Sequence, residues 1–198
     1  FVRDVEPGEV LILGPDGPKS VRPFPPAPSA HCIVEHVYFA RPDSMMEGMS
    51  VYDARTRIGA ELARESHVPA DVVIPVPDSG VPAAVGYSQF SGVPFELGII
   101  RNHYVGRTFI QPTQSVRELG VRMKHAPNRA AIEGKRIILI DDSLVRGTTS
   151  KKIVRMMRDA GAKEVHFRLA SPPIVNPDYY GIDLPDRGGL LAATHTIE

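Results

Sequence analysis

Apolar residues follow two different periods along this chain, and the two periods alternate. Short apolar runs bounded by turn residues predict strands, whereas apolar residues three and four positions apart predict helices. The predicted strands are residues 71–77, 93–101, 135–141 and 164–170, and the predicted helices are residues 53–65, 82–92 and 149–160. Strand–helix–strand units place their strands in parallel. The pattern therefore predicts an α/β fold with a doubly wound, mainly parallel sheet and flanking helices, whose ligands bind beyond the carboxyl ends of the strands.

Single residues mark the faces and ends of two of these helices. Thr149 or Ser150 is placed to cap the helix over 149–160, and Gly161 is placed to end it. Its expected apolar face consists of Ile153, Val154, Met156, Met157 and Ala160. The helix over 53–65 is expected to bury Ile58, Leu62 and Ala63 and to stop before Pro69.

Two stretches lack such a period. Residues 1–30 hold short apolar patches broken by glycine and proline, which indicates turns and extended chain, and residues 32–40 alternate like a strand. Residues 102–129 show no clean period. We therefore expect a single domain over residues 1–198, with an N-terminal arm and strand in residues 1–50.

Composition narrows the class of protein. The chain has 23 basic and 23 acidic residues, which gives no sign of a nucleic-acid partner. A single cysteine, Cys32, excludes an internal disulfide framework and fits a reducing compartment. No apolar run approaches the roughly 20 residues that a membrane span needs. We expect a cytoplasmic protein without nucleic-acid or membrane partners, and the start at Phe1 suggests a piece of a longer protein.

The stretch "IILIDDSLVRGTTS", residues 137–150, ends an apolar run on two carboxylates, Asp141 and Asp142. Adjacent carboxylates repel each other and are costly to bury, so they need a cation or several hydroxyl donors as partners. A sugar diol with a nearby divalent metal supplies both. Residues 145–150 then lead through a glycine into a helix N-terminus, where backbone N–H groups favour a phosphate. Singly these features are ordinary, but together they predict a site for a 5-phosphorylated ribose.

Two further loops fit a phosphorylated ligand. Asp78, Ser79 and Gly80 follow another predicted strand, and their small side chains let backbone amides approach a pyrophosphate, although they also suit an ordinary turn. Residues 101–129 carry six basic residues against one acidic residue. Such a charge run is commonly a solvated face. A long basic segment inside a compact domain is also typical of a flexible lid over an anionic substrate, and this is our interpretation.

Residues 137–150 resemble the phosphoribosyltransferase family, in which an aliphatic run, two acids and Gly-Thr-Thr form the signature for phosphoribosyl pyrophosphate (PRPP). The resemblance implies a type I phosphoribosyltransferase fold. It also implies that Asp141 and Asp142 hold the ribose diol and share Mg²⁺ with Ser79. The residues implied to bind PRPP are Asp78, Ser79, Gly80, Asp141, Asp142, Ser143, Val145, Arg146, Gly147, Thr148, Thr149 and Ser150.

Several stretches resemble one branch of that family, the glutamine-dependent amidophosphoribosyltransferases. They are "YFARPDS" (38–44), "VPDSG" (77–81), "NHYVGRTFIQP" (102–112), "DDSLVRGTTS" (141–150), "ASPPI" (170–174) and "YGID" (180–183). The resemblance implies that Tyr104, Arg107 and Lys124 act in catalysis from a lid that closes over PRPP.

The activity implied by this branch joins ammonia to the anomeric carbon of PRPP and expels pyrophosphate. The product is 5-phosphoribosylamine, in the first committed step of purine biosynthesis. Full-length members take ammonia from an N-terminal glutaminase domain and are expected to form homo-oligomers. We find nothing of that domain in this sequence, and we expect a C-terminal tail to be absent too, so this chain is expected to use free ammonia.

Two other functions stay open at this point. A salvage phosphoribosyltransferase would need an apolar pocket for a nucleobase, and residues 167–174, "FRLASPPI", are a candidate for it. A non-catalytic PRPP-sensing regulator would usually bring a DNA-binding segment. We find no helix-turn-helix pattern before residue 70, and a lid favours chemistry over sensing.

Some members of the branch hold a four-iron four-sulfur cluster on four cysteines. By the resemblance, Cys32 stands at the first ligand position, Asp178 at the second, and the last two fall beyond residue 198. Because thiolates are the usual ligands of such clusters, we expect none to be complete on this chain. Cys32 is instead expected to be a small buried apolar residue.

Overall fold

The computed structural model describes residues 3–102, 125–178 and 186–196. The chain divides into two compact units, residues 1–33 and residues 34–198, and each unit is described by itself. The predicted lid residues Tyr104, Arg107 and Lys124 lie outside the described residues.

The first unit contains an antiparallel hairpin of β1 (Val10–Gly14) and β2 (Gly17–Val21). This agrees with the extended chain expected from its turn residues. The Glu9 carboxylate accepts hydrogen bonds from the Arg3 guanidinium and the Ser20 hydroxyl, and these bonds lower the pKa of Glu9 well below its usual range. All the β1 side chains are exposed. Cys32 is exposed as well, so the expectation that it is buried is wrong.

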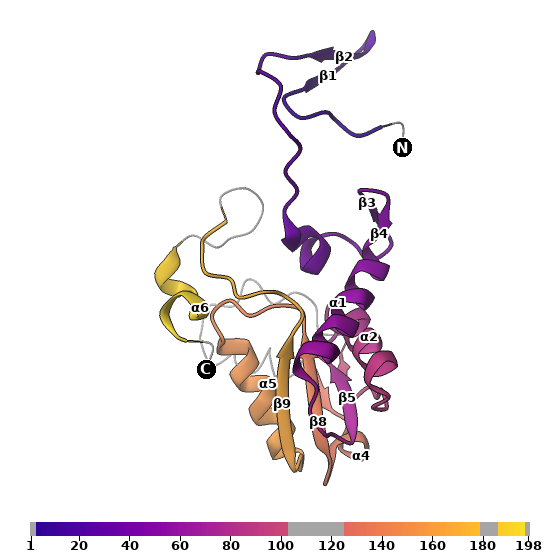
Figure 1. Ribbon diagram of the computed structural model, residues 1–198, viewed down its shortest axis with the longest axis vertical. Coiled ribbons are helices and arrows are strands. Elements are labelled where there is room, and N and C mark those ends of the chain that lie inside the picture. The colour runs from indigo at the N-terminus through magenta and orange to yellow at the C-terminus, as the bar shows by residue number, and fades with distance from the viewer. Residues whose placement is uncertain (1–2, 103–124, 179–185, 197–198) are drawn as a thin grey trace. The chain divides into compact units, whose positions relative to one another are not determined.

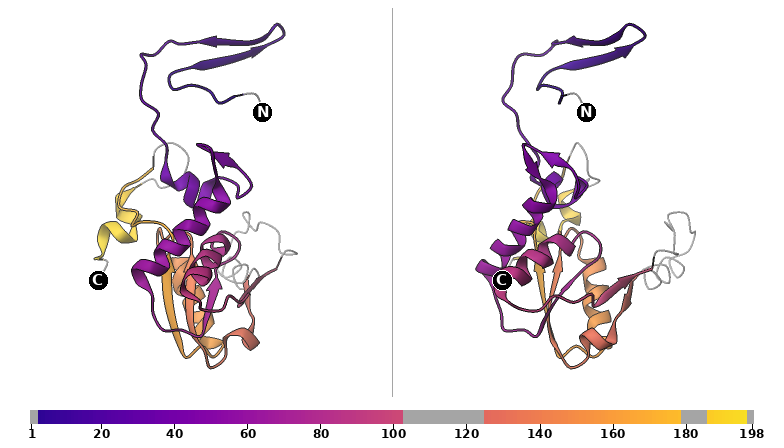
Figure 2. Two further views of the ribbon diagram at one scale, coloured as in Figure 1. Left: turned by 45° about the vertical axis from the view of Figure 1, so that its right-hand side comes forward. Right: turned by 90° about the vertical axis from the view of Figure 1, so that its right-hand side faces the viewer.

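The second unit is built on a parallel sheet of β5 (Val72–Pro75), β8 (Arg136–Asp141) and β9 (Glu164–Leu169), in the order β5-β8-β9. These three predicted strands are confirmed. The predicted strand over 93–101 is wrong in its extent, because the run divides between two partners. Phe95 bridges to Val73 in the parallel direction, whereas β6 (Ile99–Arg101) pairs antiparallel with β7 (His125–Pro127). The paired strands β6 and β7 run away from the parallel sheet (Figure 2).

Helices cover both faces of this sheet (Figure 1). They are α1 (Val51–Ser66) and α2 (Val81–Ser91) on one face and α5 (Thr148–Asp159) on the other. Strand β8 serves both layers because successive side chains point to opposite faces. Ile137 and Leu139 pack with α5, and Ile138 and Ile140 pack with α1 and α2. The doubly wound arrangement predicted from the sequence is confirmed.

Helices α1 and α2 cross closely through two glycines. A Cβ on Gly59 would lie 1.9 Å from the carbonyl oxygen of Ala83, and a Cβ on Gly86 would lie 1.8 Å from that of Thr56. The buried face of α1 therefore carries small side chains at its contact with α2. Ile58 and Leu62, expected to be buried, are only half-buried.

Residues 32–40 do not form the predicted strand. Residues 35–39 form a single π-helical turn, labelled η1 (Glu35–Phe39), in which only Val37 is buried. The guanidinium of Arg55 explains this turn, because its Nε donates to the carbonyl of His36 at 2.7 Å and an Nη to that of Ala40 at 2.8 Å. A side chain from α1 thus satisfies carbonyls that the prediction assigned to a sheet. The short strands β3 (Met45–Met46) and β4 (Met49–Ser50) follow.

Three short helices complete the described part of the chain. They are α4 (Arg129–Ile132), the 3₁₀ turn η2 (Arg187–Gly189) and α6 (Leu191–Thr194). Among the residues that the structure describes, no helix is long and apolar enough to span a membrane.

Candidate active site

Two loops meet where β5 and β8 end. Pro75 lies beside Ile140 in the parallel register, and the N–H of Val76 donates to the carbonyl of Ile140 at 2.7 Å. The following turn packs so tightly that a Cβ on Gly80 would lie 2.5 Å from the same carbonyl oxygen and 3.3 Å from the Cα of Asp141. Glycine is therefore required at this position, and the turn at 77–80 is held against the acid pair.

The acid pair is more deeply placed than the sequence suggested. We expected Asp141 and Asp142 to emerge from the strand, but both are buried. The residues after β9 continue alongside the pair, where the N–H groups of Ala170 and Ser171 donate to the carbonyls of Asp141 and Asp142 at 3.0 and 2.8 Å, and the turn at Gly80 packs against Asp141.

Burial changes the chemistry of these carboxylates. Burial, followed by the charge of Asp142, raises the pKa of Asp141 to about 7. Its carboxylate accepts the N–H of Asp142 at 2.9 Å, and the Ser143 hydroxyl donates to the Asp142 carboxylate. Burial also lowers the pKa of the Arg55 guanidinium, and the negative charge of Asp142 partly offsets this effect. The site thus concentrates negative charge that a bound cation would stabilise.

The loop after the acid pair leads into α5 through Gly147. This residue has φ +73°, a conformation that glycine adopts at little cost, and it is the N-cap of α5. No side chain caps the helix, so the prediction that Thr149 or Ser150 does so is wrong. Thr148 and Thr149 are exposed, and Ser150 is buried. The backbone N–H groups of the first turn are thereby left for another acceptor, as a phosphate site requires.

Arg101, counted in the sequence among the basic residues of segment 101–129, lies at the end of β6 and forms an ion pair with Asp78 on the turn 77–80, a pairing that the sequence did not predict. One residue near the site was not among the residues expected to bind the ligand. Arg55 is buried near Asp142. It lies four residues from both Val51 and Gly59, and this helical spacing could have predicted that Arg55 shares their buried face. Of the predicted site residues, the structure brings together the turn 77–80 with Asp141.

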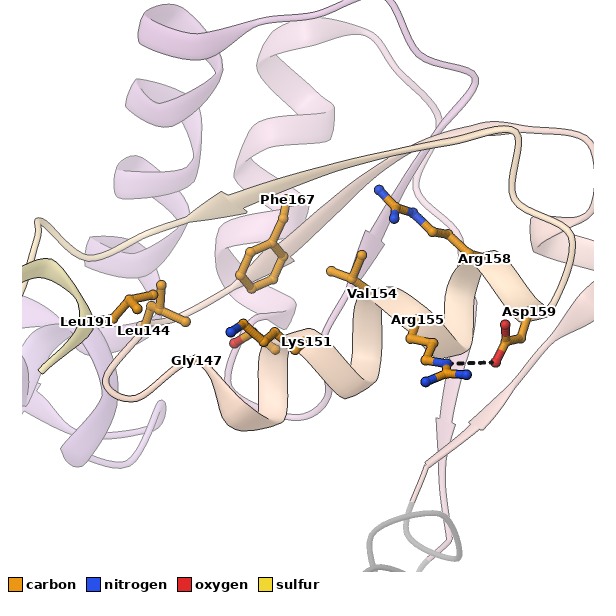
Figure 3. Close-up of a pocket in the computed structure, with 10 residues that line it drawn as sticks. Leu144, Gly147, Lys151, Val154, Arg155, Arg158, Asp159, Phe167 and Leu191 are labelled. Atoms are coloured by element: carbon orange, nitrogen blue, oxygen red, sulfur yellow. Dashed lines mark ion pairs between the residues drawn. The ribbon is translucent and has the colours of Figure 1, made fainter. Parts of the chain in front are cut away.

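A groove runs along α5 from this loop (Figure 3). It has a volume of about 580 Å³ and begins at Gly147. Its walls include the apolar side chains Leu144, Val154, Phe167 and Leu191, together with the cations Lys151, Arg155 and Arg158. The sequence analysis did not predict it.

The two residues considered for a metal cluster lie in different units. Cys32 belongs to residues 1–33, and Asp178 belongs to residues 34–198, where it is half-buried. Among the described residues, no group of three or more histidine, cysteine, aspartate or glutamate side chains is arranged to hold a metal ion.

The fold and the paired loops define a phosphoribosyltransferase, and the chain belongs to that family. The family model for the phosphoribosyl transferase domain matches residues 47–170, from just before α1 to the end of β9. The architecture is the type I phosphoribosyltransferase fold. Within the family, the chain is similar to amidophosphoribosyltransferases, as the resemblance in the sequence implied.

The similarity to these relatives extends over nearly the whole chain. The amidophosphoribosyltransferase of Rhizobium etli is 62% identical over 97% of this chain, that of Bacillus subtilis 52% over 100%, and that of Archaeoglobus fulgidus 54% over 100%. The chain spans only 40%, 42% and 43% of their respective lengths. It aligns with their phosphoribosyltransferase part.

A solved structure agrees with this assignment. The glutamine PRPP amidotransferase of Bacillus subtilis, in complex with ADP and GMP, superposes with a TM-score of 0.86 at 52% identity. The match covers 98% of this chain and 43% of that one.

Proposed function

We propose that this chain binds PRPP and transfers its phosphoribosyl group to ammonia, as the phosphoribosyltransferase part of an amidophosphoribosyltransferase. The observation that carries the proposal is the acid pair buried between the turn 77–80 and the loop before α5, in a chain 52% to 62% identical to amidophosphoribosyltransferases. The products are 5-phosphoribosylamine and pyrophosphate. This reaction is the first committed step of purine biosynthesis.

The three parts of PRPP fit three parts of this site. Asp141 and Asp142 accept the hydroxyl groups of the ribose diol, because ionised carboxylates are strong acceptors. The loop 145–150 receives the 5-phosphate on the N–H groups at the start of α5. The turn 78–80 receives the pyrophosphate, with the Arg101 guanidinium close to it through the ion pair with Asp78.

The donor set suits Mg²⁺. This ion is usually held by one or two carboxylates together with oxygens of a phosphorylated substrate, and the site offers two buried carboxylates. The raised pKa of Asp141 marks an anion that a cation would stabilise. Asp141, Asp142 and the Ser79 hydroxyl would hold the ion. When bound, Mg²⁺ supplies positive charge that stabilises the leaving pyrophosphate.

The reaction needs electrostatic stabilisation more than a protein nucleophile. The nitrogen of ammonia forms a bond to the anomeric carbon, the bond from that carbon to the pyrophosphate oxygen breaks, and the product amine loses a proton. Positive charge develops on the ribose ring, and the carboxylates of Asp141 and Asp142 lie on the diol side to stabilise it. We assign two roles to Tyr104, Arg107 and Lys124: they exclude water from the site, and they stabilise the leaving pyrophosphate.

The test supplies the chain with PRPP and Mg²⁺ and varies the acceptor. With ammonium chloride at pH 8, pyrophosphate release is expected to exceed a protein-free blank, and 5-phosphoribosylamine is trapped as product. Release with adenine, guanine or hypoxanthine and none with ammonium would instead identify a salvage enzyme. PRPP binding without release for any acceptor would identify a regulator and refute the enzymatic proposal.

A further inference from the structure

The loop that precedes α5 is covered on its outer side by residues from the far end of the chain. The N–H of Leu191 donates to the carbonyl of Val145 at 2.8 Å. The Leu191 Cδ2 atom lies 3.2 Å from the position that a Cβ on Gly147 would occupy. Figure 3 shows the Leu191 side chain next to that of Leu144, at the end of the groove where the loop passes. Leu191 therefore holds this loop by one backbone bond and one apolar contact.

The segment that carries Leu191 is itself fixed. Leu190 is only 1% exposed, which anchors the start of α6. The Asp186 carboxylate accepts the N–H of Gly189 at 2.8 Å, and the Thr194 hydroxyl donates to the carbonyl of Leu190 at 3.1 Å. These bonds and the buried Leu190 restrict the backbone on both sides of Leu191.

The loop needs such support because it lacks a side-chain cap. Gly147 has φ +73° and gives the backbone more freedom than any other residue would. Phosphate binding depends on several N–H groups pointing at one place, and preorganised donors bind better than mobile ones. A contact that restricts Val145 and Gly147 therefore acts directly on the geometry of the phosphate site.

We propose that Leu191 is a positioning residue for the 5-phosphate loop of this chain. The inference rests on the proposed function. The family model ends at residue 170, so Leu191 supports the shared site from outside the shared domain. Leu191 contacts the loop at Val145 and Gly147. Its loss is expected to weaken binding of the phosphorylated ribose while leaving binding of pyrophosphate, at the other loop, unchanged.

The test compares Leu191→Ala with Leu191→Met and with Val154→Ala. Val154 lines the same groove, and its truncation is a matched loss of apolar contact away from the loop. Calorimetry with ribose 5-phosphate is expected to show about tenfold weaker binding for Leu191→Ala, since small misplacements of binding groups cost up to about a hundredfold. Leu191→Met and Val154→Ala should stay within about twofold of the parent chain, because volume-conserving and remote changes are well tolerated. Binding of magnesium pyrophosphate should be the same for all four proteins.

Amide hydrogen exchange, measured without ligand, provides a second and independent test of the contact between Leu191 and the loop. The amides of residues 145–149 are expected to exchange faster in Leu191→Ala than in Val154→Ala. Equal exchange in the two variants, or unchanged ribose 5-phosphate affinity in Leu191→Ala, would overturn the positioning role. Failure of the parent chain to bind PRPP would refute the proposed function instead, and the exchange rates would still test the contact.

Discussion

The two ends of the β5–β8 pair carry carboxylates in opposite states. At the amino end, the exposed Asp71 accepts hydrogen bonds from the backbone N–H, Nε and an Nη of Arg136, at 2.8, 3.1 and 2.7 Å. These bonds lower the pKa of Asp71 well below its usual range. At the carboxyl end, Asp141 is buried beside another carboxylate, and its pKa is raised to about 7.

The contrast separates structure from function along one pair of strands. A paired carboxylate at the surface contributes to holding two strand ends together. A buried carboxylate beside a second one costs stability, and a fold tolerates this cost where a ligand recovers it. We therefore assign the amino end to the scaffold and the carboxyl end to the ligand.

The largest effect is expected from Asp141→Asn. Pyrophosphate release with ammonium should fall by roughly a hundredfold, because a hydrogen bond to a charged group contributes about 1.5–3 kcal/mol. The assay is the initial rate with saturating Mg²⁺ and PRPP at pH 8. A rate within about twofold of the parent chain would contradict the assignment, given that a tenfold change needs only about 1.4 kcal/mol.

Gly80→Ala tests the contact between the two loops. A Cβ 2.5 Å from the carbonyl oxygen of Ile140 forces the backbone to move, so unfolding should become easier by roughly 2 kcal/mol. PRPP affinity should fall as well. The control is Gly134→Ala, whose glycine has φ +74° with open space around it. That variant should lose stability by about 1 kcal/mol and keep its PRPP affinity. Equal losses of PRPP affinity in the two variants would show that the contact between the loops does not support PRPP binding.

The pH dependence of stability should distinguish the two ends without any ligand. For Asp141 the folded pKa of about 7 lies above the unfolded value of about 4, so its ionisation costs stability increasingly above pH 4 and fully above pH 7. Asp141→Asn should therefore be more stable than the parent chain at pH 8, by up to roughly 4 kcal/mol for a pKa shift of about three units, and equal to it near pH 4. Urea unfolding in a metal-free buffer measures the difference. A gap that is constant with pH would show that Asp141 is not the titrating group.

Asp71→Asn should have the smallest effect and the opposite sign. The folded pKa of Asp71 lies below its unfolded value, so its contribution is present above about pH 4 and disappears as the pH falls through the folded pKa. The variant should be slightly less stable than the parent chain at neutral pH. Because the pair is exposed, the difference is small. Thermal unfolding at pH 7 and at pH 3 checks the sign of the difference and the beginning of its decline below pH 4.

Sequence patterns predicted the strands and helices of the scaffold, but they did not predict that the acid pair is buried. The apolar run 137–140 and the helical spacing in 149–160 led to β8 and α5, because local periods fix such elements. The surroundings of Asp141 include the residue after β9 and the turn at Gly80, and no local pattern contains these contacts. The same holds for residues 35–39, where Arg55 captures the carbonyls.

The contacts around the phosphate loop were also beyond reach of the sequence. The support from Leu191 joins residues far apart along the chain, and the ion pair of Asp78 with Arg101 depends on the path of β6. Motif spacing identified the loop itself, since its glycine and hydroxyl residues are contiguous. Motif spacing thus identifies the residues that bind the ligand, whereas tertiary contacts determine how these residues are arranged in space.

The most direct test of the central claim measures PRPP affinity and stability together in Asp141→Asn and Asp71→Asn. Calorimetry with PRPP and Mg²⁺ at pH 8 is combined with urea unfolding of the same preparations. We predict that Asp141→Asn loses PRPP affinity and gains stability, while Asp71→Asn keeps affinity and loses stability. If Asp141→Asn binds PRPP as well as the parent chain does, the carboxyl end of β8 is not the ligand site and the account is contradicted.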